Sequence, residues 1–310
     1  MLGVLEGFAI ILTVIFIGYL LSQFRVITSD DQRLVLNRIA FYAATPALIF
    51  MVVSQSSREA FFSQVILVEA ITALVTAGIF VLISRRFFPA DRASTVMGAA
   101  ATAYVNSNNI GLPVGIYVLG NGGYVAPLLV VQMIVFTPLI LALISESKTE
   151  VSRARKIGKA VLTGLFSPIV VGAALGMVVG LTNTQLPEAI MEPIKILGGA
   201  SIPMILMSFG ASLGGARPLS DPQQRTAALT ATALKTVGMP LISIGLGLLW
   251  GLRGDELYAV AILSALPTAQ NVYNYAATYQ RGMVVTRDTV LLSTFLALPV
   301  MLIIAAAFGR

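Results

Sequence analysis

Residues 104–113 read YVNSNNIGLP and interrupt an otherwise apolar run that extends from about 94 to 119. Three amides, a glycine and a proline in this stretch disfavour a continuous helix. Proline removes a backbone donor and clashes with the carbonyl four residues before it, and glycine loosens the same turn. Freed backbone groups are tolerated inside a membrane only where they face protein or a water-filled cavity. The stretch therefore predicts a broken helix whose break faces inward.

A second stretch, residues 265–275, reads ALPTAQNVYNY and repeats this design in the run 256–280. Two broken helices in one bundle are expected to cross near the bilayer centre, where each half-helix N-terminus presents free N–H groups and the positive end of a dipole. A carboxylate is the natural ligand for such a crossing. The candidate substrate-binding amides are Asn106, Asn108, Asn109, Gln270, Asn271 and Asn274.

These amides have a simpler interpretation as hydrogen-bonding bridges between membrane helices. One isolated asparagine would favour that interpretation. Two amide clusters at equivalent, proline-broken places favour a binding site, with Asn106 and Asn109 on one face of the first helix and Gln270 and Asn274 on one face of the second.

The composition indicates a chain whose solvent is lipid. Of its 310 residues 57% are hydrophobic and 11% are charged, and the mean hydropathy is +0.88. A soluble domain carries about 25% charged residues. The net charge of +6 does not indicate nucleic acid binding, because the basic residues are dispersed between apolar runs. Cysteine and histidine are absent, so we expect no disulfide, no metal site and no cofactor.

Apolar runs of about 20 residues predict membrane-spanning helices. We place ten of them near 4–22, 34–53, 62–84, 94–119, 123–145, 160–181, 190–213, 226–251, 256–280 and 287–308. With the N-terminus outside, the outer loops hold Arg58, Lys195, Arg253 and Arg310, Lys235 lies within a span, and the other fifteen of the 20 Lys and Arg residues fall inside. This asymmetry predicts that both termini lie outside the membrane.

Proline positions indicate an internal repeat. Pro46 and Pro203 are 157 residues apart, Pro113 and Pro267 are 154 apart, and Pro138 and Pro299 are 161 apart. Halves of five spans have opposite topology, so the pattern predicts an inverted repeat. The expected fold is an all-α membrane protein with two inverted five-helix repeats, 1–145 and 160–310, joined by a cytoplasmic linker at 146–159, and with crossed broken helices at the fourth and ninth spans.

These residues resemble the auxin efflux carrier family of permeases, within the bile-acid/arsenite/riboflavin transporter superfamily. The strongest similarities are at 106–113 and 265–279, with a further one at Gln132. The resemblance implies a scaffold of spans 1, 2, 6 and 7 and a transport domain of spans 3–5 and 8–10, which moves as an elevator within a homodimer. It also implies that Asn106, Pro113, Gln132 and Pro267 contact the substrate, and it places the chain in a bacterial inner membrane. The polar residues after Pro267 favour a small organic anion, such as a mono- or dicarboxylate, over auxin itself.

Glu69 and Lys235 are the ionisable side chains, tyrosines aside, within the spans proper, away from their ends, and an ionisable group there indicates function by default. They are candidates for proton coupling or for a structural pair. A sodium-coupled symporter of the bile-acid type and a non-transporting sensor remain alternatives. An enzyme is not expected, because the aspartates lie in or near loops and histidine is absent.

Overall fold

The computed structural model describes residues 2–55, 63–88, 91–144, 158–159, 162, 165–182, 184–212 and 219–310. The predicted linker 146–159 therefore lies outside the described residues except for its last two. The described chain is helical, and its β-structure is confined to one isolated bridge between Val105 and Thr268. Seven of the described helical segments are long and apolar enough to cross a membrane. The protein is thus a multi-pass membrane protein.

The helices follow the predicted order. They are α1 (Leu2–Gln23), α2 (Asp30–Ile39), α3 (Thr45–Ser54), α5 (Gln64–Phe87), α6 (Arg92–Ala103), α7 (Leu112–Tyr117), α8 (Val125–Val131), α9 (Thr137–Ile144), α11 (Pro168–Thr182), α12 (Glu188–Ala211), α13 (Arg225–Ala233), α14 (Met239–Leu249), α15 (Gly254–Ser264), α16 (Gln270–Tyr279) and α17 (Met283–Ala307).

Prolines explain where several of these helices change their winding. Four π-helical turns are described, η1 (Ala40–Ala44), η2 (Ser107–Gly111), η4 (Gln132–Phe136) and η5 (Leu234–Gly238). Each one ends two residues before a proline, and these are Pro46, Pro113, Pro138 and Pro240. Proline cannot donate to the ordinary helical ladder and crowds the preceding turn. A π-turn inserts one extra residue at that point, so the helix continues past the proline.

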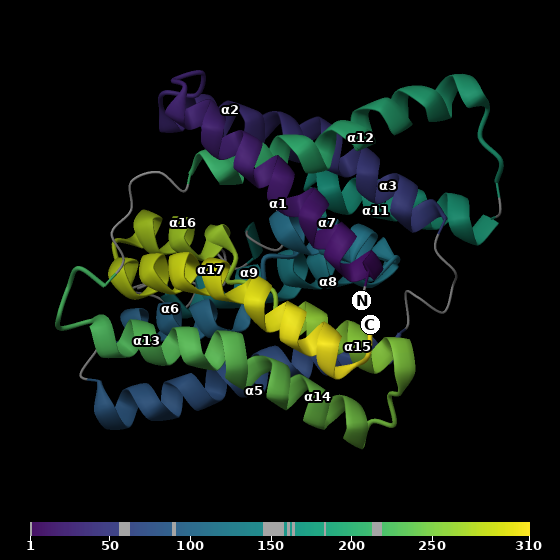
Figure 1. Ribbon diagram of the computed structural model, residues 1–310. Helices are drawn as coiled ribbons and strands as arrows, with labels where there is room; N and C mark the ends of the chain where they lie inside the picture. The colour runs from purple at the N-terminus through teal and green to yellow at the C-terminus, as the bar shows by residue number, and fades with distance from the viewer. Residues whose placement is uncertain are drawn as a thin grey trace.

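The helices pack in two groups, which lie at the top and bottom of Figure 1. In the first group, α1 packs along α12, and α3 packs against α11 and α12. In the second group, α5 contacts α6, α14 and α15, while α17 contacts α6, α13, α15 and α16. Helix α8 contacts both groups, since it packs against α3 and α11 of the first and α5 of the second, and α7 contacts α1.

Glycines allow the close approach of α11 to α3. Gly172, Gly176 and Gly180 are spaced four residues apart, so they share one face of α11. A Cβ on Gly172 would lie 2.6 Å from the carbonyl oxygen of Pro46, and one on Gly176 would lie 2.6 Å from that of Phe50. Small residues at this spacing let membrane helices pack backbone to backbone.

Two predicted boundaries were wrong. The run 160–181 is interrupted by a turn at Phe166 and Ser167, because a residue before a proline, here Pro168, disfavours the helical region. The last helix begins at Met283 rather than near 287, so Asp288 is not a loop residue but lies buried in the second turn of α17.

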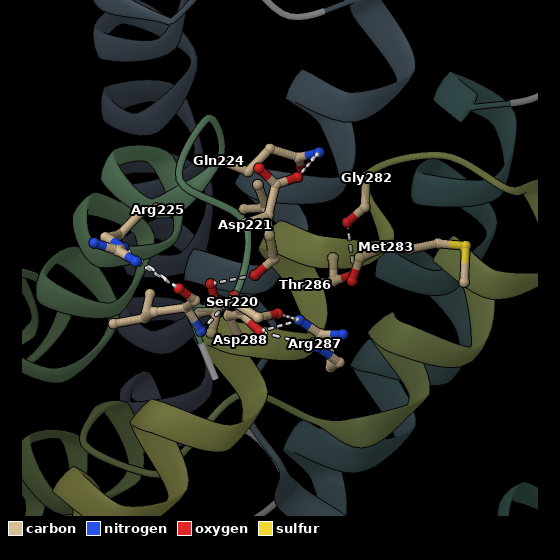
Figure 2. A network of polar contacts seen from close by, with 12 residues as sticks. Ser220, Asp221, Gln224, Arg225, Gly282, Met283, Thr286, Arg287 and Asp288 are labelled. Carbon is tan, nitrogen blue, oxygen red and sulfur yellow. Dashed lines mark hydrogen bonds and ion pairs between the residues drawn. The ribbon is translucent and has the colours of Figure 1, made fainter. Parts of the chain in front are cut away.

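Polar contacts around Asp288 hold the chain where it enters α13 (Figure 2). The Asp288 carboxylate accepts a 3.0 Å hydrogen bond from the backbone N–H of Leu219 and pairs with Arg287 at 2.9 Å. Arg287 also donates to Ser220, and Arg225 donates to the carbonyl oxygen of Leu219. These bonds fix the segment that follows α12 onto α13 and α17, which belong to the second packing group.

Candidate functional site

The two helix breaks predicted from the sequence are present, and they contact each other. The first break, at 104–106, separates α6 from η2 and α7, and the second, at 265–269, separates α15 from α16. The backbone N–H of Asn106 donates to the carbonyl oxygen of Pro267 at 2.8 Å, and that of Ala269 donates to Tyr104 at 3.0 Å. The breaks therefore run antiparallel, and each satisfies part of the backbone that the other frees.

The first break is held largely by amide side chains. Asn106 is 5% exposed, and its Oδ1 accepts a 3.0 Å hydrogen bond from the N–H of Asn109, which caps the following turn. Gln132, from η4, donates to the carbonyl oxygen of Val105 at 3.0 Å and accepts from the hydroxyl of Ser107 at 2.7 Å. Gln132 therefore joins the two sides of the break.

The second break is held by hydroxyl groups and an ammonium. The Thr268 hydroxyl donates to the carbonyl oxygen of Ala101 at 2.6 Å, and the Thr268 N–H donates to Ser293 on α17 at 3.0 Å. Lys235, from η5, donates to the carbonyl oxygen of Ser264, the last residue of α15, at 2.8 Å. Thr268 and Ser293 escaped the sequence analysis, which weighed amides and ionisable groups; the position of Thr268 directly after Pro267 was the available signal.

A cavity of about 910 Å³ lies against both breaks. Of the candidate residues, its lining includes Asn106, Asn108, Asn109, Gln132, Gln270, Asn271 and Asn274. Pro113 and Pro267 do not line it. Since η2 and α16 both begin at the cavity, their N-terminal turns, with N–H groups that no earlier helical turn satisfies, point toward it.

The cavity ends at the breaks on one side and reaches solvent on the other. Beyond the breaks, Leu112, Val114 and Leu266 are fully buried and fill the space between helices. In the opposite direction the lining includes the exposed side chains of Arg38 and Lys159.

The described charged side chains that line the cavity are all cationic. Arg33, Arg38 and Lys159 line it, and no aspartate or glutamate of the described chain does. In the sequence these three residues give only a topology signal, and their place in the lining follows from the fold alone. The arrangement suits a small anion and disfavours a cation.

Three hydroxyl-bearing side chains of the lining also form a chain that the sequence analysis missed. The hydroxyls of Tyr104 and Thr137 lie 3.1 Å apart, and those of Thr137 and Tyr275 lie 3.3 Å apart. These residues join the first break, α9 and α16 in one polar wall.

Glu69 and Lys235 are buried away from the cavity, being 1% and 0% exposed and outside its lining. Glu69 accepts a 3.0 Å hydrogen bond from Ser243 on α14, while its second carboxylate oxygen is buried without a partner. Lys235 binds Ser264 and the sulfur of Met239 instead. The two side chains are therefore neighbours in one buried polar region but have different hydrogen-bonding partners.

A polar cavity enclosed by multi-pass helices is typical of membrane transporters. Comparison with known proteins agrees: residues 4–305 match the family described as membrane transport protein. The chain belongs to this family, which is that of the auxin efflux carriers.

Similar proteins carry corresponding descriptions. The chain is 21% identical to the uncharacterized transporter MJ1031 of Methanocaldococcus jannaschii, over 93% of this chain and 94% of that protein. It is 21% identical to the uncharacterized transporter YfdV of Escherichia coli, over 84% and 83% of the two chains. It is also 26% identical to auxin efflux carrier component 6 of Arabidopsis thaliana, over 46% of this chain and 26% of that protein.

Proposed function

We propose that this chain is a secondary transporter of small organic anions, with mono- or dicarboxylates as the substrate class. One observation carries the proposal: the two contacting helix breaks close a cavity that is lined by amides and by three cationic side chains, without a carboxylate in its described lining. Amide donors and helix N-termini bind carboxylates without needing a metal ion.

The proposed topology has ten spans in two inverted five-helix repeats, with both termini outside a bacterial inner membrane. The helical segments support this topology, because those before residues 146–159 and those after them follow the same order of unbroken and broken helices. In each half the fourth segment is the broken one, α6–α7 in the first and α15–α16 in the second. With this orientation, Arg38 and Lys159 lie on the cytoplasmic side, so the cavity is open inward.

We also propose that the second packing group moves against the first as an elevator, in a homodimer held together by the first group. The first group then corresponds to the scaffold of spans 1, 2, 6 and 7. The second, together with α7, α8 and α9, corresponds to the transport domain of spans 3–5 and 8–10. The packing supports this division, since both breaks and their supporting residues Gln132, Thr268 and Lys235 belong to the proposed moving part.

Proton coupling through Glu69 completes the proposal, with Lys235 as its buried countercharge. The unpartnered carboxylate oxygen of Glu69 supports it, because a proton on that oxygen removes the cost of burying a charge. Sodium coupling of the bile-acid type is the alternative. Uptake that needs sodium and does not respond to a proton gradient would favour that alternative and remove Glu69 from the mechanism.

The test measures uptake of labelled malonate and acetate into proteoliposomes by the wild type and by Gln270→Ala and Asn106→Ala. Gln270 lines the cavity without supporting a break, so its loss should lower uptake about tenfold while the melting temperature stays unchanged. This corresponds to about 1.4 kcal/mol, close to the lower end of the contribution of one hydrogen bond to a charged group.

The matched control is Gln223→Ala, which removes an exposed amide before α13 and should transport as the wild type does. Full uptake by both cavity variants would refute the assignment of the site. Binding of anions without flux would identify a sensor instead of a transporter.

A further inference from the structure

Arg33 and Arg38 lie on α2, which packs against α12 of the first packing group, whereas the amides beside the breaks lie at the first break, on η2, on η4 and on α16. One further amide of the lining, Asn37, lies on α2 between the two arginines. The cavity lining thus combines the cations of α2 with the amides of the two breaks. Neutral donors surround the breaks, and cations lie toward the solvent-exposed end, with Arg33 half-buried and Arg38 exposed. Lys159, just before the turn that precedes α11, adds a third cation at that end.

The amides and the cations bind an anion in different ways. Amides and backbone N–H groups at the breaks satisfy one carboxylate at close range. A guanidinium attracts charge at longer range and binds a carboxylate bidentately when the two meet. An anion with a single carboxylate held at the breaks leaves the cationic end of the cavity without a ligand group, whereas an anion with two carboxylates has one for each set of donors.

We infer that Arg33 and Arg38 hold the second carboxylate of a dicarboxylate substrate, and that they do so only while the cavity is open on their side. This inference rests on the proposed transport function. It adds that the substrate carries two carboxylates and that its affinity differs between the two faces of the membrane. Arg33 and Arg38 belong to the proposed scaffold, so they stay in place when the transport domain carries the substrate across. The same substrate presented from the opposite face then meets the amides but not these arginines.

Two consequences follow. The dianion binds more tightly from the side of Arg33 and Arg38 than from the other side. Release on that side is correspondingly slower, because differences in affinity lie mostly in the dissociation rate. Acetate, with one carboxylate, gains far less from the arginines.

The experiment compares Arg33→Gln/Arg38→Gln with Arg85→Gln/Arg86→Gln in the full-length protein. The control pair also removes two arginines, but from the exposed end of α5, outside the cavity lining. Dissociation constants are measured by calorimetry with malonate and with acetate, and Michaelis constants for malonate are measured from each face in vesicles of known orientation.

We expect Arg33→Gln/Arg38→Gln to raise the malonate dissociation constant at least tenfold and the acetate constant no more than threefold. The malonate Michaelis constant should rise on one face only. Equal losses for malonate and acetate, equal rises on both faces, or the same result with Arg85→Gln/Arg86→Gln would overturn the inference.

The proposed function fails in a different way. If malonate binding is intact in the wild type and is lost with Gln270→Ala, an unaffected Arg33→Gln/Arg38→Gln variant removes only the inference on dicarboxylates. A wild type that binds neither malonate nor acetate overturns both proposals.

Discussion

The two helix breaks meet in one place but are built differently. At the first break, the supporting groups are Asn106, Ser107 and Gln132, and all three also line the cavity. At the second break, the supporting groups are Thr268, Ser293 and Lys235, and none of them lines it. The amides that follow the second break, Gln270 and Asn271, reach the cavity without supporting the break.

This difference separates two roles that the sequence makes look alike. Substitutions at the first break change support and ligand contact together, because the same side chains do both. At the second break the two roles lie on different residues, so each can be removed alone. Structural and binding effects are therefore best distinguished at the second break.

Lys235→Met gives the largest expected effect on stability. It removes the ammonium from the carbonyl end of α15 and leaves Glu69 buried without its nearby positive charge. We expect about 3–5 kcal/mol of destabilisation, the range found when one member of a buried charge pair is removed. The measurement is the melting temperature of the detergent-solubilised protein.

Two further variants sharpen that result. Glu69→Gln combined with Lys235→Met should recover at least half of the loss, because neither charge is then left alone in the interior. Lys195→Met, on the exposed Lys195 of α12, removes a lysine paired with Glu192 and should leave the melting temperature unchanged. A melting temperature of Lys235→Met equal to that of the wild type would contradict the support assigned to this lysine.

Thr268→Val separates the support of the second break from the cavity. Valine keeps the size and β-branching of the buried Thr268 but loses the hydrogen bond to the carbonyl oxygen of Ala101. We expect about 1 kcal/mol of destabilisation. Binding of malonate should change little, because Thr268 does not line the cavity, whereas Gln270 does.

The control for that experiment is Thr268→Ser, which keeps the hydroxyl and should retain most of the wild-type stability. If Thr268→Val binds malonate normally while Gln270→Ala does not, the break and the ligand contacts are independent. If Thr268→Val is as stable as the wild type, the hydrogen bond to Ala101 contributes nothing measurable.

Much of this arrangement was predictable from local chemistry. Amides, glycine and proline in one apolar run cannot form an undisturbed helix, so both breaks followed from residues 104–113 and 265–275 alone. Their contact followed from the need to satisfy freed backbone groups away from lipid. Composition and hydropathy identified the membrane class for the same reason.

What could not be predicted depends on contacts between distant segments. Thr268 binds Ala101, 167 residues before it, and no local pattern relates the two. Arg33 and Lys159 gave the same topology signal as any loop cation, and only the folded arrangement of segments distant in the sequence puts them in one cavity lining. Pro113 and Pro267 are the reverse case, since their effect on the backbone was predicted, while the structure keeps them out of the lining.

The smallest expected effect concerns the other ends of the two broken helices. Asp91 caps the start of α6 through the N–H of Ser94, and Arg281, just after α16, pairs with it at 3.1 Å. Asp91 lies outside the spanning segments. The hydrogen bonds from Ser94, with a smaller contribution from Arg281, hold the pKa of this carboxyl below its ordinary value. A lowered pKa in the folded state means that the carboxylate stabilises the fold above the ordinary pKa of aspartate, near pH 4, and that this contribution is lost as the pH falls through the lower folded value.

Asp91→Asn should therefore cost no more than about 0.5 kcal/mol at pH 7, because asparagine still caps the helix and the ion pair is largely exposed. Asp91→Ala removes the cap as well and should cost about 1 kcal/mol. Melting temperatures measured from pH 7 down to pH 3 should converge for Asp91→Asn and the wild type as the carboxyl becomes protonated. A constant difference across that range would assign the effect to packing instead of charge.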